Sequence, residues 1–350
     1  MKIDGIKILY FTKYIRQGAS SRLRSYQYFT KLEGQGIQVD VSPLFNEKYL
    51  KKIYAGEKPR SEIIKAYLKR FFSLFKMMNY DCVITEKELF PYLPAWFEWL
   101  LMKLDIRFLV DYDDAIFHNY DRHSNKLIRK YLGHKIDKVM KYSSCVIAGN
   151  SYLAERAYKA RAKHIELMPT VIDQKRYQQK KIFSSKKLKI GWIGSPLTFK
   201  YLKSIRNVLE QFGHEKNIEV HIVGSLETLD IKNVKEIHYE WSENNEVKDI
   251  LNFDVGVMPL ENTLWAKGKC AYKLIQYMAC GIPVIASPVG MNKQVIDQGK
   301  NGFLAETDEE WIDALNALHG NSELQKKMGE HGLKKIDEIY NLETQSKKLI

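Results

Sequence analysis

The chain alternates short apolar runs with amphipathic stretches, and this alternation constrains its fold more than any other feature. Strands that alternate with helices predict a parallel sheet whose crossover helices cover both faces. In the first half the run 22–33 predicts a helix that ends at Gly34. The strands expected there are 6–11, 37–41, 82–85, 107–110 and 145–148.

The pattern is interrupted once and then restarts. Residues 174–189, QKRYQQKKIFSSKKLK, are polar and basic, which predicts a linker. We expect strands at 189–193, 219–223, 255–258 and 284–286, helices near 201–212 and over 271–279, and final helices from about 308.

A chain of 350 residues is long enough for two cores. We therefore expect an α/β protein of two Rossmann-like doubly wound domains, 1–178 and 186–335. They should face each other across a cleft at the carboxyl ends of their strands, where such folds bind ligands. The C-terminal helix, about 336–350, is expected to pack back on the first domain.

Composition limits the classes of partner. The chain has 55 Lys and Arg against 42 Asp and Glu, a net charge of +13. A basic protein suits nucleic acid, an anionic membrane or phosphorylated small molecules. No zinc-finger, basic-zipper or RNA-recognition signature is present, so nucleic acid is not expected. Four scattered cysteines without CxxC spacing, and the lack of a signal peptide or a long apolar run, predict a cytoplasmic protein without zinc.

The stretch GKCAYKLIQYMACGIPVIASPVG, residues 268–290, carries the strongest functional signal. A helix that follows a strand and a long turn presents free N–H groups and a positive dipole end, which together favour an anion. Lys267, Lys269 and Lys273 add positive charge, and Gln276 lies one turn beyond Lys273. A basic surface loop before a core helix would use the same residues, so both interpretations stay open at this point.

A longer stretch, DVGVMPL…KLIQYMACGIPVIASPVGMNKQVIDQGKNGFLAE, resembles the nucleotide-sugar-binding half of retaining GT-B glycosyltransferases of family four. Those enzymes commonly read Glu-x7-Glu-Ala-Met-Ala-x-Gly-x-Pro-Val-(Val/Ile)-Ala-Ser here. NSYLAERA, HIELMPTVID, IGWIG…K and WSENNEVKDILNF match further parts of the family pattern, so the resemblance covers essentially the whole chain. It implies a GT-B fold and sugar transfer without a metal ion or other cofactor.

The chain departs from the family pattern at several charged positions. Gly268 and Gln276 stand where the family has its two glutamates. An amide can hold a ribose, but Gly268 cannot replace an acid. The Gly-Arg…Lys diphosphate clamp appears as Gly194-Ser195…Lys200. The donor-binding residues implied by the resemblance are Gly18, Gly194, Ser195, Thr198, Lys200, Lys269, Cys270, Ala271, Tyr272, Lys273 and Gln276.

Acidic residues follow an expected strand in FLVDYDDAIFHNYDRH. Asp111-Tyr112-Asp113 matches the metal-binding Asp-x-Asp of the other large glycosyltransferase fold, but no metal is expected in a GT-B enzyme. Asp113, Asp114 and His118 are the catalytic candidates, because many relatives place a His-Asp pair beside the sugar. The alternative is that the acids only cap a helix and the histidine has no role.

The segment IRQGASSRLRSYQYF follows the first strand, where the family has a Gly-rich loop beside the donor phosphate. Gly18 permits a close backbone approach. Arg22 and Arg24 begin the next helix and are candidates for contact with a phosphate or the acceptor. A solvated basic first turn is the alternative for both arginines.

Residues 61–80 and 90–104 are rich in aromatic side chains, and lysines are interleaved in the first segment. Such helices can lie in a membrane interface, where basic residues contact anionic lipid. For most of their apolar residues we expect instead that they cover the sheet. Together with the net charge, these segments predict peripheral association with the inner face of the cell membrane.

The function expected from the resemblance is transfer of a sugar from a nucleotide diphosphate sugar to a surface polysaccharide or lipid-linked glycan, with retention of anomeric configuration. Two alternatives remain. A catalytically silent nucleotide-sugar or polysaccharide-binding subunit would explain the missing glutamates. A GT-B-fold sugar-nucleotide epimerase would act on the donor without an acceptor.

Overall fold

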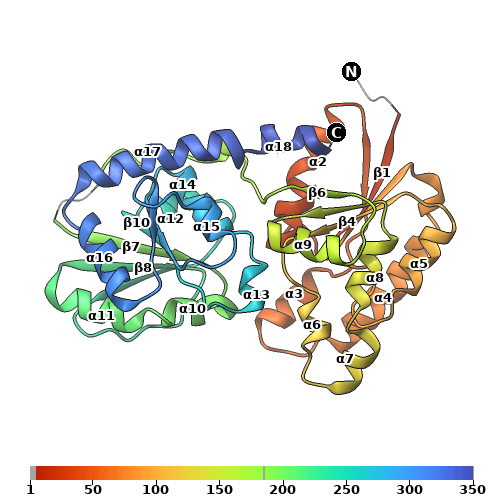
Figure 1. Ribbon diagram of the computed structural model, residues 1–350, viewed down its shortest axis with the longest axis horizontal. Helices are drawn as coiled ribbons and strands as arrows, with labels where there is room; N and C mark the ends of the chain where they lie inside the picture. Colours follow the sequence, from red (N-terminus) through yellow and green to blue (C-terminus); the bar gives the residue numbers. More distant parts are fainter. Residues whose placement is uncertain (1–4, 184–185, 350) are drawn as a thin grey trace. The chain divides into compact units, whose positions relative to one another are not determined.

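The computed structural model describes residues 5–183 and 186–349 (Figure 1). The chain forms two compact units, residues 5–170 with 346–349, and residues 171–345. Each unit contains one six-stranded sheet in which all described strand pairs are parallel. The predicted α/β class and the two doubly wound halves are therefore confirmed.

The sheet of the first unit has the strand order β2-β1-β3-β4-β5-β6. The chain leaves β1 for β2 on one side and then returns to β3 on the other side. Ligands bind beside the carboxyl ends of strands at such a reversal. The elements are β1 Lys7–Phe11, α1 Ala19–Ser21, the π-helical turn η1 Arg22–Tyr26, α2 Gln27–Glu33, β2 Gln38–Val41, α3 Glu47–Tyr54, α4 Arg60–Leu74, the short helix η2 Met77–Asn79, β3 Cys82–Glu86, α5 Trp96–Lys103, β4 Phe108–Tyr112, α6 His118–Asp121, α7 Lys126–Leu132, α8 Lys135–Tyr142, β5 Cys145–Ala148, α9 Ser151–Lys159 and β6 Ile165–Leu167.

The sheet of the second unit has the order β12-β11-β10-β7-β8-β9, and its reversal lies between β7 and β10. The elements are η3 Gln174–Arg176, β7 Leu188–Ile193, η4 Pro196–Thr198, α10 Phe199–Lys203, α11 Arg206–Glu215, β8 Ile218–Val223, β9 Lys235–Tyr239, α12 Glu246–Ile250, β10 Val255–Met258, α13 Leu264–Lys267, α14 Tyr272–Ala279, β11 Val284–Ala286, α15 Asn292–Val295, β12 Gly302–Leu304, α16 Asp308–Leu318 and α17 Ser322–Ile339. The last helix, α18 Leu342–Leu349, begins in the second unit and ends in the first.

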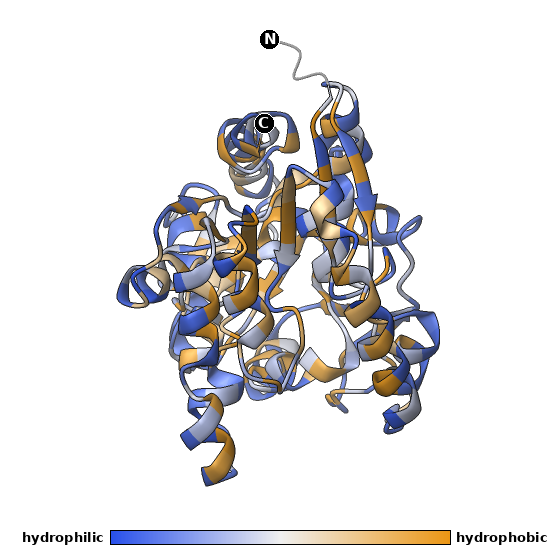
Figure 2. Ribbon diagram, turned by 90° about the vertical axis from the view of Figure 1, so that its right-hand side faces the viewer, coloured by the Kyte–Doolittle hydropathy of each residue, from blue (hydrophilic) through white to orange (hydrophobic). Residues whose placement is uncertain are grey.

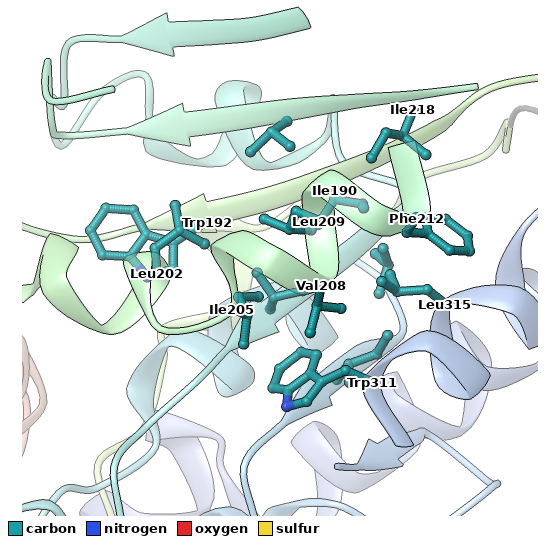
Figure 3. Close-up of a cluster of buried hydrophobic side chains, with 14 of the residues drawn as sticks. Ile190, Trp192, Leu202, Ile205, Val208, Leu209, Phe212, Ile218, Trp311 and Leu315 are labelled. Carbon is teal, nitrogen blue, oxygen red and sulfur yellow. The ribbon is translucent and has the colours of Figure 1, made fainter. Parts of the chain in front are cut away.

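The core of the second unit forms where helices α11 and α16 pack on β7 and β8. Figure 3 shows Ile190 of β7 beside Leu209 of α11, and Trp311 of α16 beside Val208 of the same helix α11. The apolar residues of α11 recur at helical spacing, so one face of this helix is buried against the sheet. The strand β7 is buried in this core up to its last residue, so the loop that follows starts from a packed strand.

Three strands were not predicted from the sequence: β6, β9 and β12. Each lies at an edge of its sheet and pairs with one neighbour in the described part of the chain. The strand β9, KEIHY, is half-buried at best, so its residues do not form an apolar run. The helix expected near 201–212 is in fact two helices, α10 and α11, and the helix expected at 22–33 begins with a π-helical turn.

The boundary between the units lies at residues 170 and 171, whereas the sequence suggested an end at 178 and a restart at 186. Residues 171–174 pair with the chain after α17. Ile172 N–H donates to the Tyr340 carbonyl over 3.1 Å, and Asn341 donates to the Gln174 side chain over 2.8 Å. These bonds place residues 171–178 and 336–345 together in the second unit, and only residues from 346 onward join the first unit.

The expectation that most apolar residues of α4 and α5 cover the sheet is wrong. Phe72 and Phe75 at the end of α4, and Trp96 and Trp99 of α5, are exposed. Figure 2 looks onto this unit and shows hydrophobic and hydrophilic stretches alternating along its helices. The inward faces of both helices carry buried charged residues next to apolar ones. Within the described residues, no helix combines the length and hydropathy required to cross a membrane.

Candidate functional site

The loops that follow β7 and β10 leave the second sheet at its reversal point, side by side. The first loop contains Gly194 and leads into η4. The second leads through α13 into α14, the helix of the motif at 268–290. Because β7 and β10 are neighbours in the sheet, residues far apart in sequence meet here.

Lys273 lies at the centre of this meeting point. Its Nζ is 4.1 Å from the centroid of the Trp192 ring. It also contacts the backbone turn at Gly194, where an added Cβ would lie 2.6 Å from Nζ. Burial, and secondarily the positive charge of Lys269, lowers the pKa of Lys273 well below its usual value. Burial disfavours the charged form of this lysine, and a nearby anion would favour it.

The start of α14 has an unusual backbone. Ala271 precedes the helix at φ 52° and ψ 25°, the left-handed region, and its side chain makes no cap. A non-glycine residue in this region costs about 1–2 kcal/mol, and such strain clusters at functional sites. Cys270 and Ala271 are buried, and Lys269 is half-buried. The first turn of α14 therefore has no side-chain cap at its N-cap residue.

Gln276 contacts a tyrosine from the segment predicted to be a linker. Its Nε2 donates to the Tyr177 hydroxyl over 3.2 Å, and the hydroxyls of Tyr177 and Tyr272 are 3.4 Å apart. Burial, followed by the influence of Tyr272, raises the pKa of Tyr177 well above its usual value. The segment predicted to be a linker therefore packs on the second unit at Tyr177, which orients the amide of Gln276.

Ser195, Thr198 and Lys200 lie along the turn after Gly194. Thr198 donates from both its N–H and its hydroxyl to the Ser195 carbonyl, each over 2.9 Å. Lys200 is exposed on α10, with Nζ 5.2 Å from the centroid of the Tyr201 ring. The structure thus brings Gly194 and Lys273 together, whereas Lys200 is exposed on α10.

The acids of the first unit gather around a lysine that the sequence analysis did not single out. Lys87 Nζ is 2.9 Å from Asp113 Oδ1 and 3.7 Å from Asp114 Oδ2. Ser20 donates to Asp113 Oδ2 over 2.6 Å. Burial would raise the pKa of Asp113, but the Lys87 ammonium and the hydroxyl of Ser20 hold it at about 2. Asp113 is therefore a permanent carboxylate, and Asp114 is the more exposed of the two acids.

This lowered pKa predicts an acid-dependent contribution to stability. Asp113 stabilises the fold above its unfolded pKa of about 4, and this contribution disappears as the pH falls toward 2. Between pH 5 and pH 2 we expect the free energy of unfolding to fall about 2 kcal/mol further in the unsubstituted chain than in Asp113→Asn. Urea unfolding at several pH values measures this difference, and parallel curves would contradict it.

The other candidates of the first unit have structural partners. Arg24 binds Asp111 through two hydrogen bonds, 2.9 Å from Nε and 2.5 Å from NH2, and also donates to the Met168 carbonyl. Arg22 is buried as well, so neither arginine forms the solvated basic turn. His118 contacts Asp121 through Nδ1 at 2.8 Å and Tyr152 through Nε2 at 2.9 Å.

Gly18 is required by packing and not by backbone conformation. Its φ of −75° is ordinary, but an added Cβ would lie 2.4 Å from the Tyr14 side chain. The loop after β1 is held further by the buried carboxylate of Glu86, which accepts from the hydroxyls of Ser21 and Ser25 over 2.5 Å each. Gly18 thus allows this loop to fold tightly beside the ends of β1 and β3.

Lys87, Glu86, Trp192 and Tyr177 are the site residues that the sequence analysis missed. The run TEKELF holds a signal for the first two, because charged residues directly follow an apolar strand. Lys87 also has a positive φ of 67°. Trp192 lies within an apolar strand, so nothing in the sequence distinguishes it from an ordinary core residue.

Comparisons with known proteins find a family match for part of the second unit. Residues 188–321 match the family described as glycosyl transferases group 1. A 76-residue segment is 28% identical to spore coat protein SA of Bacillus subtilis, and it spans 21% of this chain and 20% of that relative.

Solved structures resemble the whole chain. Sucrose-phosphate synthase from Thermosynechococcus elongatus gives a TM-score of 0.71 at 14% identity, covering 99% of this chain and 97% of that one. Anabaena HepE in complex with UDP and glucose gives 0.69 at 14% identity, covering 99% and 98%. The predicted GT-B fold is confirmed by these likenesses.

Proposed function

We propose that this chain, which has a GT-B fold and matches the glycosyl transferases group 1 family at residues 188–321, is a glycosyltransferase. It transfers a sugar from a nucleotide diphosphate sugar to a surface polysaccharide or lipid-linked glycan. Transfer proceeds with retention of anomeric configuration and without a metal ion. The observation that carries the proposal is the contact of Lys273 with Gly194 and Trp192 at the β7/β10 reversal.

The leaving diphosphate is the group that this arrangement would stabilise. Negative charge develops on it as the sugar leaves, and fixed donors aimed at that charge lower the barrier. The N–H groups at the start of α14 and the ammonium groups of Lys273 and Lys269 are assigned this role, and the exposed Lys200 of α10 adds positive charge. Gln276, oriented by Tyr177, takes the place of the family's ribose-binding glutamate.

In the first unit Asp114 is the carboxylate assigned to a sugar hydroxyl. Asp113 is already engaged by Lys87 and Ser20, and its pKa of about 2 excludes it as a general acid. His118 orients the turn after β4 through Asp121 and Tyr152 and is assigned no proton transfer. The acceptor is lipid-linked or polymeric, and the chain works in the cytoplasm on the inner face of the cell membrane.

A thermal-shift panel of nucleotide diphosphates and nucleotide sugars tests the donor. UDP is the first choice, because HepE was crystallised with it. A ligand at about 100 times its Kd stabilises a protein by about 2.7 kcal/mol, which for a chain of this size raises Tm by about 5 °C. Lys200→Ala should diminish the shift.

Three outcomes would contradict this proposal, and two of them would indicate an alternative function. If none of the nucleotides raises Tm, the proposal that the chain binds a nucleotide sugar is contradicted. If a nucleotide sugar binds but is neither hydrolysed nor transferred to any glycan acceptor, the chain is a binding subunit. Epimerised donor formed without an acceptor would indicate an isomerase.

A further inference from the structure

The densest group of exposed apolar side chains in the described chain lies on α4, η2 and α5. More than half of the exposed large hydrophobic residues fall within residues 64–104. We call this group the α4–α5 surface and define it by Leu68, Phe72, Phe75, Met78, Trp96 and Trp99. Phe75 is 69% exposed and Trp96 is 66% exposed, so these are not partly covered core residues.

The two helices form one continuous surface. The ring of Phe71 on α4 meets Phe75 edge-on at 5.5 Å and Phe97 of α5 at 6.1 Å. Phe97 in turn packs on Phe90 at 4.7 Å. The aromatic contacts therefore run from α4 to α5 without a break, and the exposed side chains on both helices belong to a single patch.

Buried charges fix the outward direction of this patch. Arg70, on the inner face of α4, donates to the carbonyls of Thr12 and Ser42 over 2.8 and 3.0 Å. Glu98, on the inner face of α5, accepts from Leu89 N–H over 2.9 Å. Turning either helix to bury its aromatic side chains would break these bonds and leave charges unpaired. Large groups of exposed apolar side chains on a folded protein mark interaction surfaces.

The charge around the patch selects its partner. The cations of both helices that flank it are exposed: Arg60, Lys65, Lys69, Lys76 and Lys103. The acids of the same helices, Glu62 and Glu98, are buried. Lys103 lies with Nζ 5.9 Å from the centroid of the Trp99 ring, so cation and aromatic groups share one face. A second copy of the chain would bring five like charges against five, which disfavours a dimer through this surface.

We infer that the α4–α5 surface docks the chain on an anionic lipid bilayer. Phe72, Phe75 and Met78 enter the boundary between headgroups and acyl chains, and Trp96 and Trp99 lie at headgroup level. Lys65, Lys69 and Lys76 extend to lipid phosphates. This inference rests on the membrane location in the proposed function and identifies the surface that contacts the membrane. The experiment that tests it needs no nucleotide.

Sedimentation of the full chain with vesicles tests the docking. We expect binding to phosphatidylcholine vesicles that contain about 30% phosphatidylglycerol, and much weaker binding to pure phosphatidylcholine. Replacing Lys65, Lys69 and Lys76 together by glutamine should weaken binding about a hundredfold at low salt. Phe72→Ser with Phe75→Ser should weaken it at least about tenfold.

A matched control uses α7 of the same unit. Leu127 and Tyr131 are 62% and 69% exposed, so Leu127→Ser with Tyr131→Ser removes a similar apolar area elsewhere. This control should bind vesicles like the unsubstituted chain. Because all the substituted side chains are exposed, every variant should keep its Tm, which separates a docking defect from misfolding.

Tryptophan fluorescence gives an independent readout. Trp192 and Trp311 are buried, whereas Trp96 and Trp99 are on the proposed interface. Anionic vesicles should shift the emission to the blue, and Trp96→Phe with Trp99→Phe should remove the shift while sedimentation persists. Equal binding by all variants would overturn the inference. So would a dimer that the Phe72 and Phe75 substitutions dissociate. A chain that does not bind vesicles can still show the nucleotide-induced rise in Tm, so the two experiments distinguish the failure of membrane docking from the failure of donor binding.

Discussion

The variant Lys273→Met is expected to bind UDP about a hundredfold more weakly than the unsubstituted chain and yet to unfold at a higher temperature. The loss of affinity follows from removing a charge-assisted contact in a partly desolvated site, about 2.7 kcal/mol. The gain in stability follows because methionine packs on Trp192 without a cation whose pKa burial has lowered. A gain of about 1 kcal/mol is typical of such a substitution.

Isothermal titration with UDP and urea unfolding of the same preparation measure the two effects. Lys203→Met is the matched control, because Lys203 lies on α10 and pairs with Glu227 over 2.9 Å. It should bind UDP normally. An unchanged affinity of Lys273→Met would show that the anion does not contact Lys273, and a loss of both affinity and stability would show that the lysine is structural.

The pH dependence of UDP binding supplies a second test of the same residue. Lys273 has a lowered pKa in the free chain, and a bound diphosphate would raise it. Binding therefore takes up a proton between these two pKa values. Affinity should be highest below the lowered pKa and should decrease as the pH rises through it. Lys273→Met should lack this decrease.

The variant Arg24→Met is expected to lose about 3–5 kcal/mol of unfolding free energy, because it leaves the carboxylate of Asp111 buried without its partner. The side chains of Arg24 and Asp111 are 1% and 6% exposed, so water cannot solvate the carboxylate that loses its partner. Urea unfolding measures the loss. Arg107→Met, which replaces an exposed arginine just before β4, should change stability by less than about 0.5 kcal/mol.

The double variant Arg24→Met with Asp111→Asn distinguishes an unpaired charge from a simple loss of packing. Removing both charges should recover at least half of the lost stability, because no ion remains to be desolvated. If Arg24→Met keeps its stability but loses nucleotide or acceptor binding, Arg24 contacts a ligand as the sequence first suggested. The two bonds to Asp111 favour the structural result.

The segment from β10 to β11, where we propose that the donor binds, shows how much of a site local sequence can predict. The strand β10, the helix α14 and the strand β11 lie within a residue of the predicted positions, because each is a continuous apolar or periodic segment. The sequence therefore located Lys273 at a helix start. It could not reveal the contact of Gln276 with Tyr177, because these residues are almost a hundred positions apart in the sequence and meet only in the folded chain.

The first unit shows where local sequence misleads. Arg22 and Arg24 have the pattern of an exposed basic turn, yet the π-helical turn at η1 directs them into the interior. Lys87 gains its importance only because β3 and β4 are neighbours, which brings it to Asp113 and Asp114. Edge strands such as β9 lack an apolar run because one of their sides has no neighbour to pack against.

The amino-acid sequence by itself determined the two doubly wound halves and the position of helix α14, because the periodicity of apolar residues and the chemistry of helix ends act over a few neighbouring residues. The tertiary structure alone decided which charges pair and which faces remain outside. The helices α4 and α5 illustrate the difference: both are amphipathic, but the buried bonds of Arg70 and Glu98 turn their aromatic sides to solvent. The direction of a helix face depends on partners distant in sequence, which local patterns do not contain.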